Sequence, residues 1–281
     1  MKELWVDFKE NKGAVIGLII VIIFVGLALF APLLAPKDPS QIYPDALRLP
    51  PVWAGGLPHF AFGTDDVGRD ILSRLIYGAR ISMLIGLCVV VLSLAVGVIL
   101  GLVSGYFGGW IDSLIMRMMD ILMALPSILL AIVVVAVIGP GIKNAIFAVA
   151  LFSIPGFTRI VRASVLAEKN KQYVMASKSF GASSLRIMFL EILPNCMAPL
   201  IVQATLGFSD GILNAAALGF LGLGTQPPTP EWGVMLSDAR SFIESSPWMV
   251  TLPGICILIV VLGFNLFGDG LRDTLDPRLK R

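Results

Sequence analysis

The side chains that could do catalytic or metal chemistry are few in this sequence and form no recognisable pair or triad. There is one histidine, His59, which excludes a His-rich metal site and the HExxH pair of a metalloprotease. The three cysteines, Cys88, Cys196 and Cys256, lie in apolar runs without the spacing of a zinc site or a disulfide. Redox and metal chemistry are therefore not expected.

One carboxylate stands out because of its position. Asp210 alone interrupts an apolar stretch that runs from 192 to 230, and an ionisable group in mid-membrane faces a cavity or a partner. Gln203 and Asn214 fall roughly on the same helix face. We expect these three residues to line a polar pathway or to pair with another membrane protein. An internal structural ion pair is the alternative for Asp210.

The composition shows what must position these residues. Of 281 residues, 57% are hydrophobic and only 14% are charged, and the mean hydropathy is +0.88. A soluble domain carries about a quarter charged residues, so lipid must be the solvent for most of this chain. The net charge is only +2, which indicates no nucleic-acid partner. The expected fold class is an all-α integral membrane protein.

Charge-free windows predict six transmembrane helices, because a helix that crosses the hydrocarbon needs roughly 20 apolar residues. The predicted helices are 13–35, 81–106, 113–138, 143–162, 196–221 and 248–268. The first apolar stretch is too long for a cleaved signal peptide. Pro126 and Pro155 interrupt two helices as kinks or hinges.

The distribution of Lys and Arg predicts the orientation. With the N-terminus inside, fourteen of the 21 basic residues are cytoplasmic, so the positive-inside rule places both termini in the cytoplasm. The predicted connecting segments are an amphipathic N-terminal segment 1–12, a periplasmic segment 36–80, an outer loop 222–247 and a cytoplasmic tail 270–281.

The inner segment 163–195 is predicted to project into the cytosol. It is rich in small residues, and Gly181 suits a left-handed turn between two short helices. Ser183 or Ser184 is expected to cap the second helix. Docking into a cleft on another protein would explain such a projection, and a folded loop that only covers the helix ends is the alternative.

Three further groups of residues are candidates for contacts. Gly97, Gly101 and Gly105 repeat at a spacing that allows close helix packing. The alternative is that membrane helices simply tolerate glycine and that these three have no packing role. Arg117 and Asp120 are expected to pair on one helix face. In the outer segments, six residues are candidates for contact with a partner protein, with helix capping and internal ion pairs as alternatives. They are Asp65, Asp66, Arg69, Asp70, Glu231 and Trp232.

The inner segment resembles the EAA loop of permease subunits of ABC importers. Ala176, Gly181, Leu193 and Pro194 match the loop, whereas Met175, Ser177 and Glu191 depart from it. Stretches 62–80, 218–233 and 264–277 resemble the peptide and nickel branch of this family, and most of all the C-type permease subunits of dipeptide importers.

The resemblance implies a type I importer fold and a non-catalytic subunit that moves dipeptides, or other short peptides or haem, across the bacterial inner membrane. The implied partners are a second homologous permease, two cytosolic ATPases that bind ATP and Mg, a periplasmic or lipid-anchored binding protein, the peptide and the bilayer. The sequence itself contains no Gly-x-x-x-x-Gly-Lys-Ser/Thr phosphate loop. The residues expected to dock the ATPase are Ala176, Ser177, Lys178, Gly181, Ala182, Ser183, Leu185 and Arg186. The six outer-segment candidates are those that would contact the binding protein.

Two other functions compete with this interpretation. A stand-alone, ion-coupled secondary transporter would need its own ion-coupling groups, of which Asp210 is the one candidate, and it would leave 163–195 unexplained. An intramembrane enzyme would need a second catalytic aspartate beside Asp269, and no matching motif supplies one.

Overall fold

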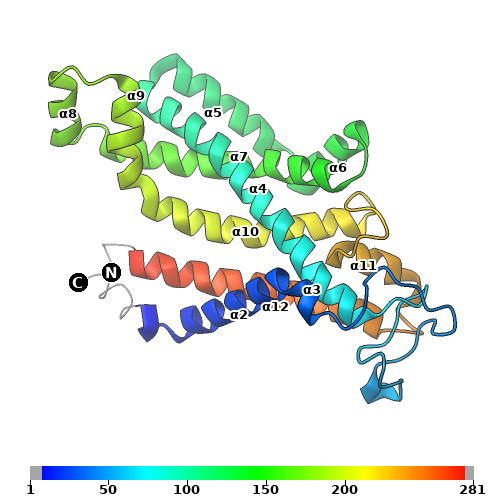
Figure 1. Ribbon diagram of the computed structural model, residues 1–281. Coiled ribbons are helices and arrows are strands. Elements are labelled where there is room, and N and C mark those ends of the chain that lie inside the picture. The colour runs from blue at the N-terminus through cyan, green and yellow to red at the C-terminus, as the bar shows by residue number, and fades with distance from the viewer. Residues whose placement is uncertain (1–7, 276–281) are drawn as a thin grey trace.

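The computed structural model describes residues 8–275 and is built from helices (Figure 1). The principal helices are α2 (Lys12–Leu29), α3 (Ala31–Leu34), α4 (Ile71–Phe107), α5 (Gly109–Ala124), α6 (Ser127–Ile138), α7 (Ile142–Glu168), α8 (Gln172–Ser179), α9 (Ser184–Arg186), α10 (Met197–Phe220), α11 (Trp232–Ala239) and α12 (Trp248–Leu275). Within the described range, five stretches are long and apolar enough to cross a membrane, and the bent pair α5–α6 gives a sixth. The predicted all-α membrane fold is confirmed.

Helix α4 begins ten residues before the predicted start at 81, so the outer segment is shorter than 36–80. The Asp70 carboxylate caps it by accepting from the Ser73 N–H at 2.8 Å. The charge-free window missed this first part because Arg74 and Arg80 interrupt it. Arg74 is nevertheless buried, since it pairs with Asp65 at 3.4 Å.

The predicted helix 113–138 is broken. Its two parts, α5 and α6, meet at an angle of 92°. Pro126 causes the break: it has no N–H to donate, and Leu125 before it adopts an extended conformation (φ −98°, ψ 142°). Pro155 and Pro253, by contrast, lie inside α7 and α12, which continue through them.

Other helix ends also differ from the predictions. Helix α7 continues to Glu168 rather than 162, and α12 continues to Leu275, so residues 270–275 are helical rather than part of a tail. Residues 1–7, which hold most of the predicted amphipathic segment, and residues 276–281, which hold half of the predicted tail, lie outside the described range. Phe8 is buried with its ring 5.9 Å from that of Phe267.

The bundle is held by close packing around α4. Helix α4 crosses the molecule diagonally, α2 and α12 lie side by side, and α8 and α11 lie at opposite ends (Figure 1). The start of α2 and the end of α12 lie at the α8 end. Three buried apolar clusters fill the contacts between these helices. Both ends of the bundle are therefore rigidly connected through long helices.

Candidate functional site: the coupling segment and the bundle faces

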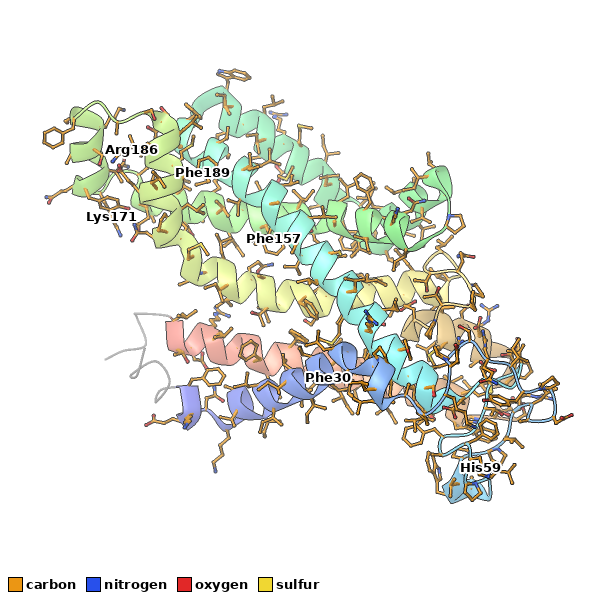
Figure 2. All side chains as sticks on the ribbon, in the orientation of Figure 1. Phe30, His59, Phe157, Lys171, Arg186 and Phe189 are labelled. Atoms are coloured by element: carbon orange, nitrogen blue, oxygen red, sulfur yellow. The ribbon has the colours of Figure 1, made fainter. Side chains whose placement is uncertain are left out.

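The residues that follow α7 form a projection, which we call the coupling segment (169–196). Helix α8 ends at a turn in which Gly181 has φ +80°, the left-handed conformation that glycine adopts without strain. Ser183 then caps α9 by accepting from the Arg186 N–H. This is the helix–glycine–helix arrangement that the sequence predicted, and it lies at one end of the molecule, opposite His59 (Figure 2).

The tip of the coupling segment exposes apolar side chains to solvent. Phe180 is 91% exposed, and Met175 and Leu185 are also largely exposed. Ala176, Lys178, Gly181, Ser183 and Arg186 are exposed as well, whereas Ser177 and Ala182 are half-buried. Large apolar groups on a projecting turn are a feature of protein contact surfaces.

The base of the coupling segment is anchored in the bundle. Ile187, Met188 and Ile192 are buried in one cluster with Val161 and Val165 of α7. Lys169 donates from Nζ to the Gly105 carbonyl at the end of α4, at 2.8 Å. A force on the exposed tip would therefore reach α4 and α7 directly.

Tyr173 attaches the coupling segment to the end of α7 through polar contacts. Its hydroxyl donates to Glu168 at 2.7 Å, and Asn195 donates to that hydroxyl at 3.2 Å. Burial, followed by the bond to Glu168, raises the pKa of Tyr173 to about 12. The hydroxyl therefore stays protonated and can hold Glu168 at all physiological pH values.

The three pathway candidates lie on α10. Asp210 is exposed, and within residues 8–275 its carboxylate has no hydrogen bond or ion pair. The Asn214 amide is used locally, since it donates to the Asp210 main-chain carbonyl at 2.8 Å. Gln203 lines a groove of about 700 Å³ between α7, α10 and α12, which Ser164, Glu168 and Arg272 also line. Among residues 8–275, no cation forms the internal ion pair that was the alternative for Asp210.

The predicted outer contact residues are mostly inside the protein, which corrects that expectation. Asp65, Arg69 and Asp70 are buried, and the Arg69 Nε donates to Asp65 at 2.6 Å. Asp238 of α11 forms longer ion pairs with the same group of arginines, at 3.6 Å from Arg69 and 4.0 Å from Arg74. A buried charge without a partner is costly, and these charged groups pair with one another. They therefore stabilise the outer segment from inside and do not form its surface. Asp66 is partly exposed.

Glu231 and Trp232 are also buried and structural. The Glu231 carboxylate caps α11 by accepting from the Gly233 and Val234 N–H groups at 2.8 and 3.1 Å. Burial raises the pKa of Glu231 to about 7, although the two backbone bonds act in the opposite direction. The Trp232 indole donates to the Leu75 carbonyl at 3.1 Å. Together they fix α11 on α4, which leaves neither side chain on the surface.

Gly97, Gly101 and Gly105 lie where α4 packs on α7. A Cβ on Gly97 would lie 2.5 Å from the Cβ of Phe157, and one on Gly105 would lie 2.7 Å from that of Val165. Distances this short are not tolerated between carbon atoms. The glycines therefore permit the close approach of the two helices.

The predicted pair of Arg117 with Asp120 is wrong. Asp120 instead accepts from Arg159 of α7 at 2.6 Å. A second pair that the sequence did not reveal, Arg162 with Asp112, makes two bonds of 2.6 Å between α7 and α5. Spacing along one helix cannot reveal partners on another helix.

The described residues form an all-helical bundle of candidate membrane spans with a segment that projects at one end. Residues 97–281 match the binding-protein-dependent transport system inner membrane component family, and residues 1–51 match the N-terminal transmembrane domain of oligopeptide transport permease C. The chain belongs to this family of inner membrane components. It is the multi-pass, non-catalytic permease part of an ABC transporter, in which ATPase partners bind ATP and a binding protein is a further component.

Similar proteins cover the full chain. It is 57% identical over 281 residues (100% of this chain, 93% of the relative) to the di/tripeptide transport system permease protein DppC of Pseudomonas aeruginosa strain UCBPP-PA14. It is 54% identical over 282 residues (100% and 96%) to the dipeptide transport system permease protein DppC of Haemophilus influenzae strain Rd. It is 58% identical over 282 residues (100% and 94%) to the DppC of Escherichia coli K12.

A solved structure shows the same fold. An inward-facing MetNI methionine ABC transporter chain superposes with a TM-score of 0.58 at 17% identity, and the match covers 72% of this chain and 96% of that one. At this identity the similarity defines the helical arrangement, the permease fold of ABC transporters.

Proposed function

We propose that this chain is one of two homologous permease subunits of an importer that moves dipeptides across the bacterial inner membrane. The full-length similarity to permeases that are named for dipeptide and di/tripeptide transport supports the substrate class. The second permease would supply the other half of the pathway. A periplasmic or lipid-anchored binding protein would deliver the peptide, and haem or other short peptides are the alternative cargo.

The observation that carries the proposal is the coupling segment. Its exposed apolar tip, around Phe180 and Leu185, is joined to a buried base that contacts both α4 and α7. We expect this tip to sit in a cleft of one of the two cytosolic ATPases, so that closure of the ATPase dimer moves α4 and α7 together. Such coupling requires contacts that differ between the inward-open and outward-open states.

This proposal fixes the orientation of the chain. The coupling segment is cytoplasmic if it meets ATPases, and the start of α2 and the end of α12 lie at the same end of the bundle. Both termini would then be cytoplasmic. The network of Asp65, Arg69 and Arg74 would be periplasmic.

Uptake of labelled dipeptide tests the proposed function. The complex should co-purify with two ATPases and should take up dipeptide only with ATP and the binding protein. A proton or sodium ionophore should leave initial uptake unchanged. Uptake that persists without ATPases and stops with an ionophore would instead identify a secondary transporter.

A further inference from the structure

One exposed ion pair lies well away from the ends of the two helices that carry it. Arg159 of α7 donates from Nη2 to the Asp120 carboxylate of α5 at 2.6 Å. The Asp120 side chain is 63% exposed and that of Arg159 is 45% exposed. Exposed ion pairs are ordinary on a water-facing surface, but this one occurs between two candidate membrane-spanning segments.

The depth of the pair follows from helix geometry. With a rise of 1.5 Å per residue, Arg159 lies about 14 Å from the end of α7 at Glu168. Asp120 lies about 16 Å from the start of α5 at Gly109 by the same measure. A 27-residue helix such as α7 is about 40 Å long and exceeds the hydrocarbon core by roughly 10 Å in total. If α7 stands upright and centred in the hydrocarbon layer, both side chains lie several ångströms inside it.

The surroundings of the Asp120–Arg159 pair differ from those of the second ion pair between α5 and α7. Arg162 and Asp112, nearer the coupling segment, are more enclosed, and Ser104 also donates to Asp112. Helix α6, beyond the break, exposes apolar residues such as Val133 and Val137 instead. A charged side chain that faces lipid at this depth costs about 2.5–3.5 kcal/mol even on the lower scales. We therefore expect the face that carries Asp120 and Arg159 to adjoin water or protein rather than lipid tails.

The backbone beside the pair supports the same conclusion. The break at Leu125 and Pro126 follows Asp120 by little more than one turn, and non-helical backbone at this depth occurs where it is buried in protein or lines a water-filled cavity. On α7, Ile160 lines the groove that Gln203 also lines, and it lies about 100° around the helix from Arg159, so the groove opens on a neighbouring face of α7.

We infer that Asp120 and Arg159 line the aqueous pathway through which the substrate passes. The ligand class is a zwitterionic peptide, whose ammonium group can pair with Asp120 and whose carboxylate can pair with Arg159. The bond between the two residues satisfies both charges when no peptide is present. This inference rests on the proposed function and adds the residues that meet the peptide's charged ends.

Aqueous accessibility of single cysteines tests the inference in the complete importer, reconstituted in lipid. The background carries Ala in place of Cys88, Cys196 and Cys256, and its ATP-dependent dipeptide uptake is measured first, which tests the proposed function separately. Asp120→Cys and Arg159→Cys are then compared with Ile22→Cys, an exposed apolar position on α2. The probe is a charged, membrane-impermeant thiol reagent that is supplied on both sides of the membrane.

We expect both pathway cysteines to react roughly tenfold or more faster than the cysteine at position 22, since only a hydrated thiol ionises readily. Saturating dipeptide with loaded binding protein should slow the reaction at positions 120 and 159 and leave the rate at 22 unchanged. A structural ion pair buried against the second permease would show neither effect. Reaction at 120 and 159 no faster than at 22, in a background that transports dipeptide, would overturn the inference.

Discussion

Gly101 of α4 and Val161 of α7 lie so close that a Cβ on the glycine would be 2.6 Å from the Cβ of the valine and 2.7 Å from the Thr158 carbonyl oxygen. This contact belongs to the packing by which α4 connects the outer end of the bundle with the base of the coupling segment. A branched side chain at Gly101 would have to push the two helices apart.

Gly101→Val should therefore destabilise the complex by about 1–3 kcal/mol, the cost of overpacking a filled interior. Thermal unfolding of the purified complex measures this. Gly26→Val is the matched control, because nothing lies within 4 Å of a Cβ at Gly26 of α2. Equal melting temperatures for the two variants would show that α4 and α7 can separate without loss.

Gly181→Val should weaken the association with the ATPases. The φ of +80° at Gly181 costs a β-branched residue about 1–3 kcal/mol, and nothing within 4 Å crowds the added atoms, so the effect acts through the turn itself. ATPase co-purification and dipeptide uptake measure it. Gly222→Val is the control, since Gly222 has φ +78° and open surroundings in the outer loop. Asn at 181 should retain most coupling, because Asn tolerates this conformation.

Arg74→Ala should destabilise the outer end of the bundle by about 3–5 kcal/mol, the range for removal of one member of a buried ion pair. The change would leave Asp65 with one cationic partner fewer and would release the Pro39 and Pro228 carbonyls, to which Arg74 donates. Arg80→Ala on the same helix is the control, because Arg80 is exposed. Limited proteolysis of residues 37–70 should accelerate only in the first variant.

Glu231 should make the stability of the protein depend on pH. Its pKa of about 7 in the fold exceeds the ordinary value of 4.5, so the folded protein binds more protons than the unfolded chain between these values. The associated stability is complete below pH 4.5 and is lost as pH rises to 7, by about 3 kcal/mol in total. Glu231→Gln should flatten the dependence of the melting temperature on pH over this range. An unchanged slope in the variant would exclude Glu231 as its source.

The sequence predicts the helices well and their partners poorly, for physical reasons that particular residues show. Hydrophobic length locates each span, and Met197–Phe220 agrees with the predicted 196–221 within one residue at each end. Pro126 and Pro155 look alike in sequence, yet only Pro126 breaks its helix, because packing on neighbouring helices decides whether the freed carbonyl is accommodated.

The charged residues show the same limit. Asp120 has Arg117 within reach on its own helix but pairs with Arg159 on another helix, which only the tertiary fold brings near. Asp65, Glu231 and Trp232 are polar residues in outer segments, where exposure is the ordinary expectation, and their burial depends on contacts with α4 and α11. The coupling segment was predictable because a local signal, Gly181 between two short amphipathic stretches, specifies it.

Photo-crosslinking from Phe180 tests the central claim, that the coupling segment receives force from an ATPase. A photoreactive phenylalanine analogue replaces Phe180 in membranes that hold the complete importer. The control carries the same analogue at Phe30, an exposed residue that follows the end of α2 farther from the coupling segment. We predict a crosslink from position 180 to the ATPase whose yield changes when ATP closes the ATPase dimer, and none from position 30. A transport-active complex in which position 180 never crosslinks to the ATPase would contradict the account.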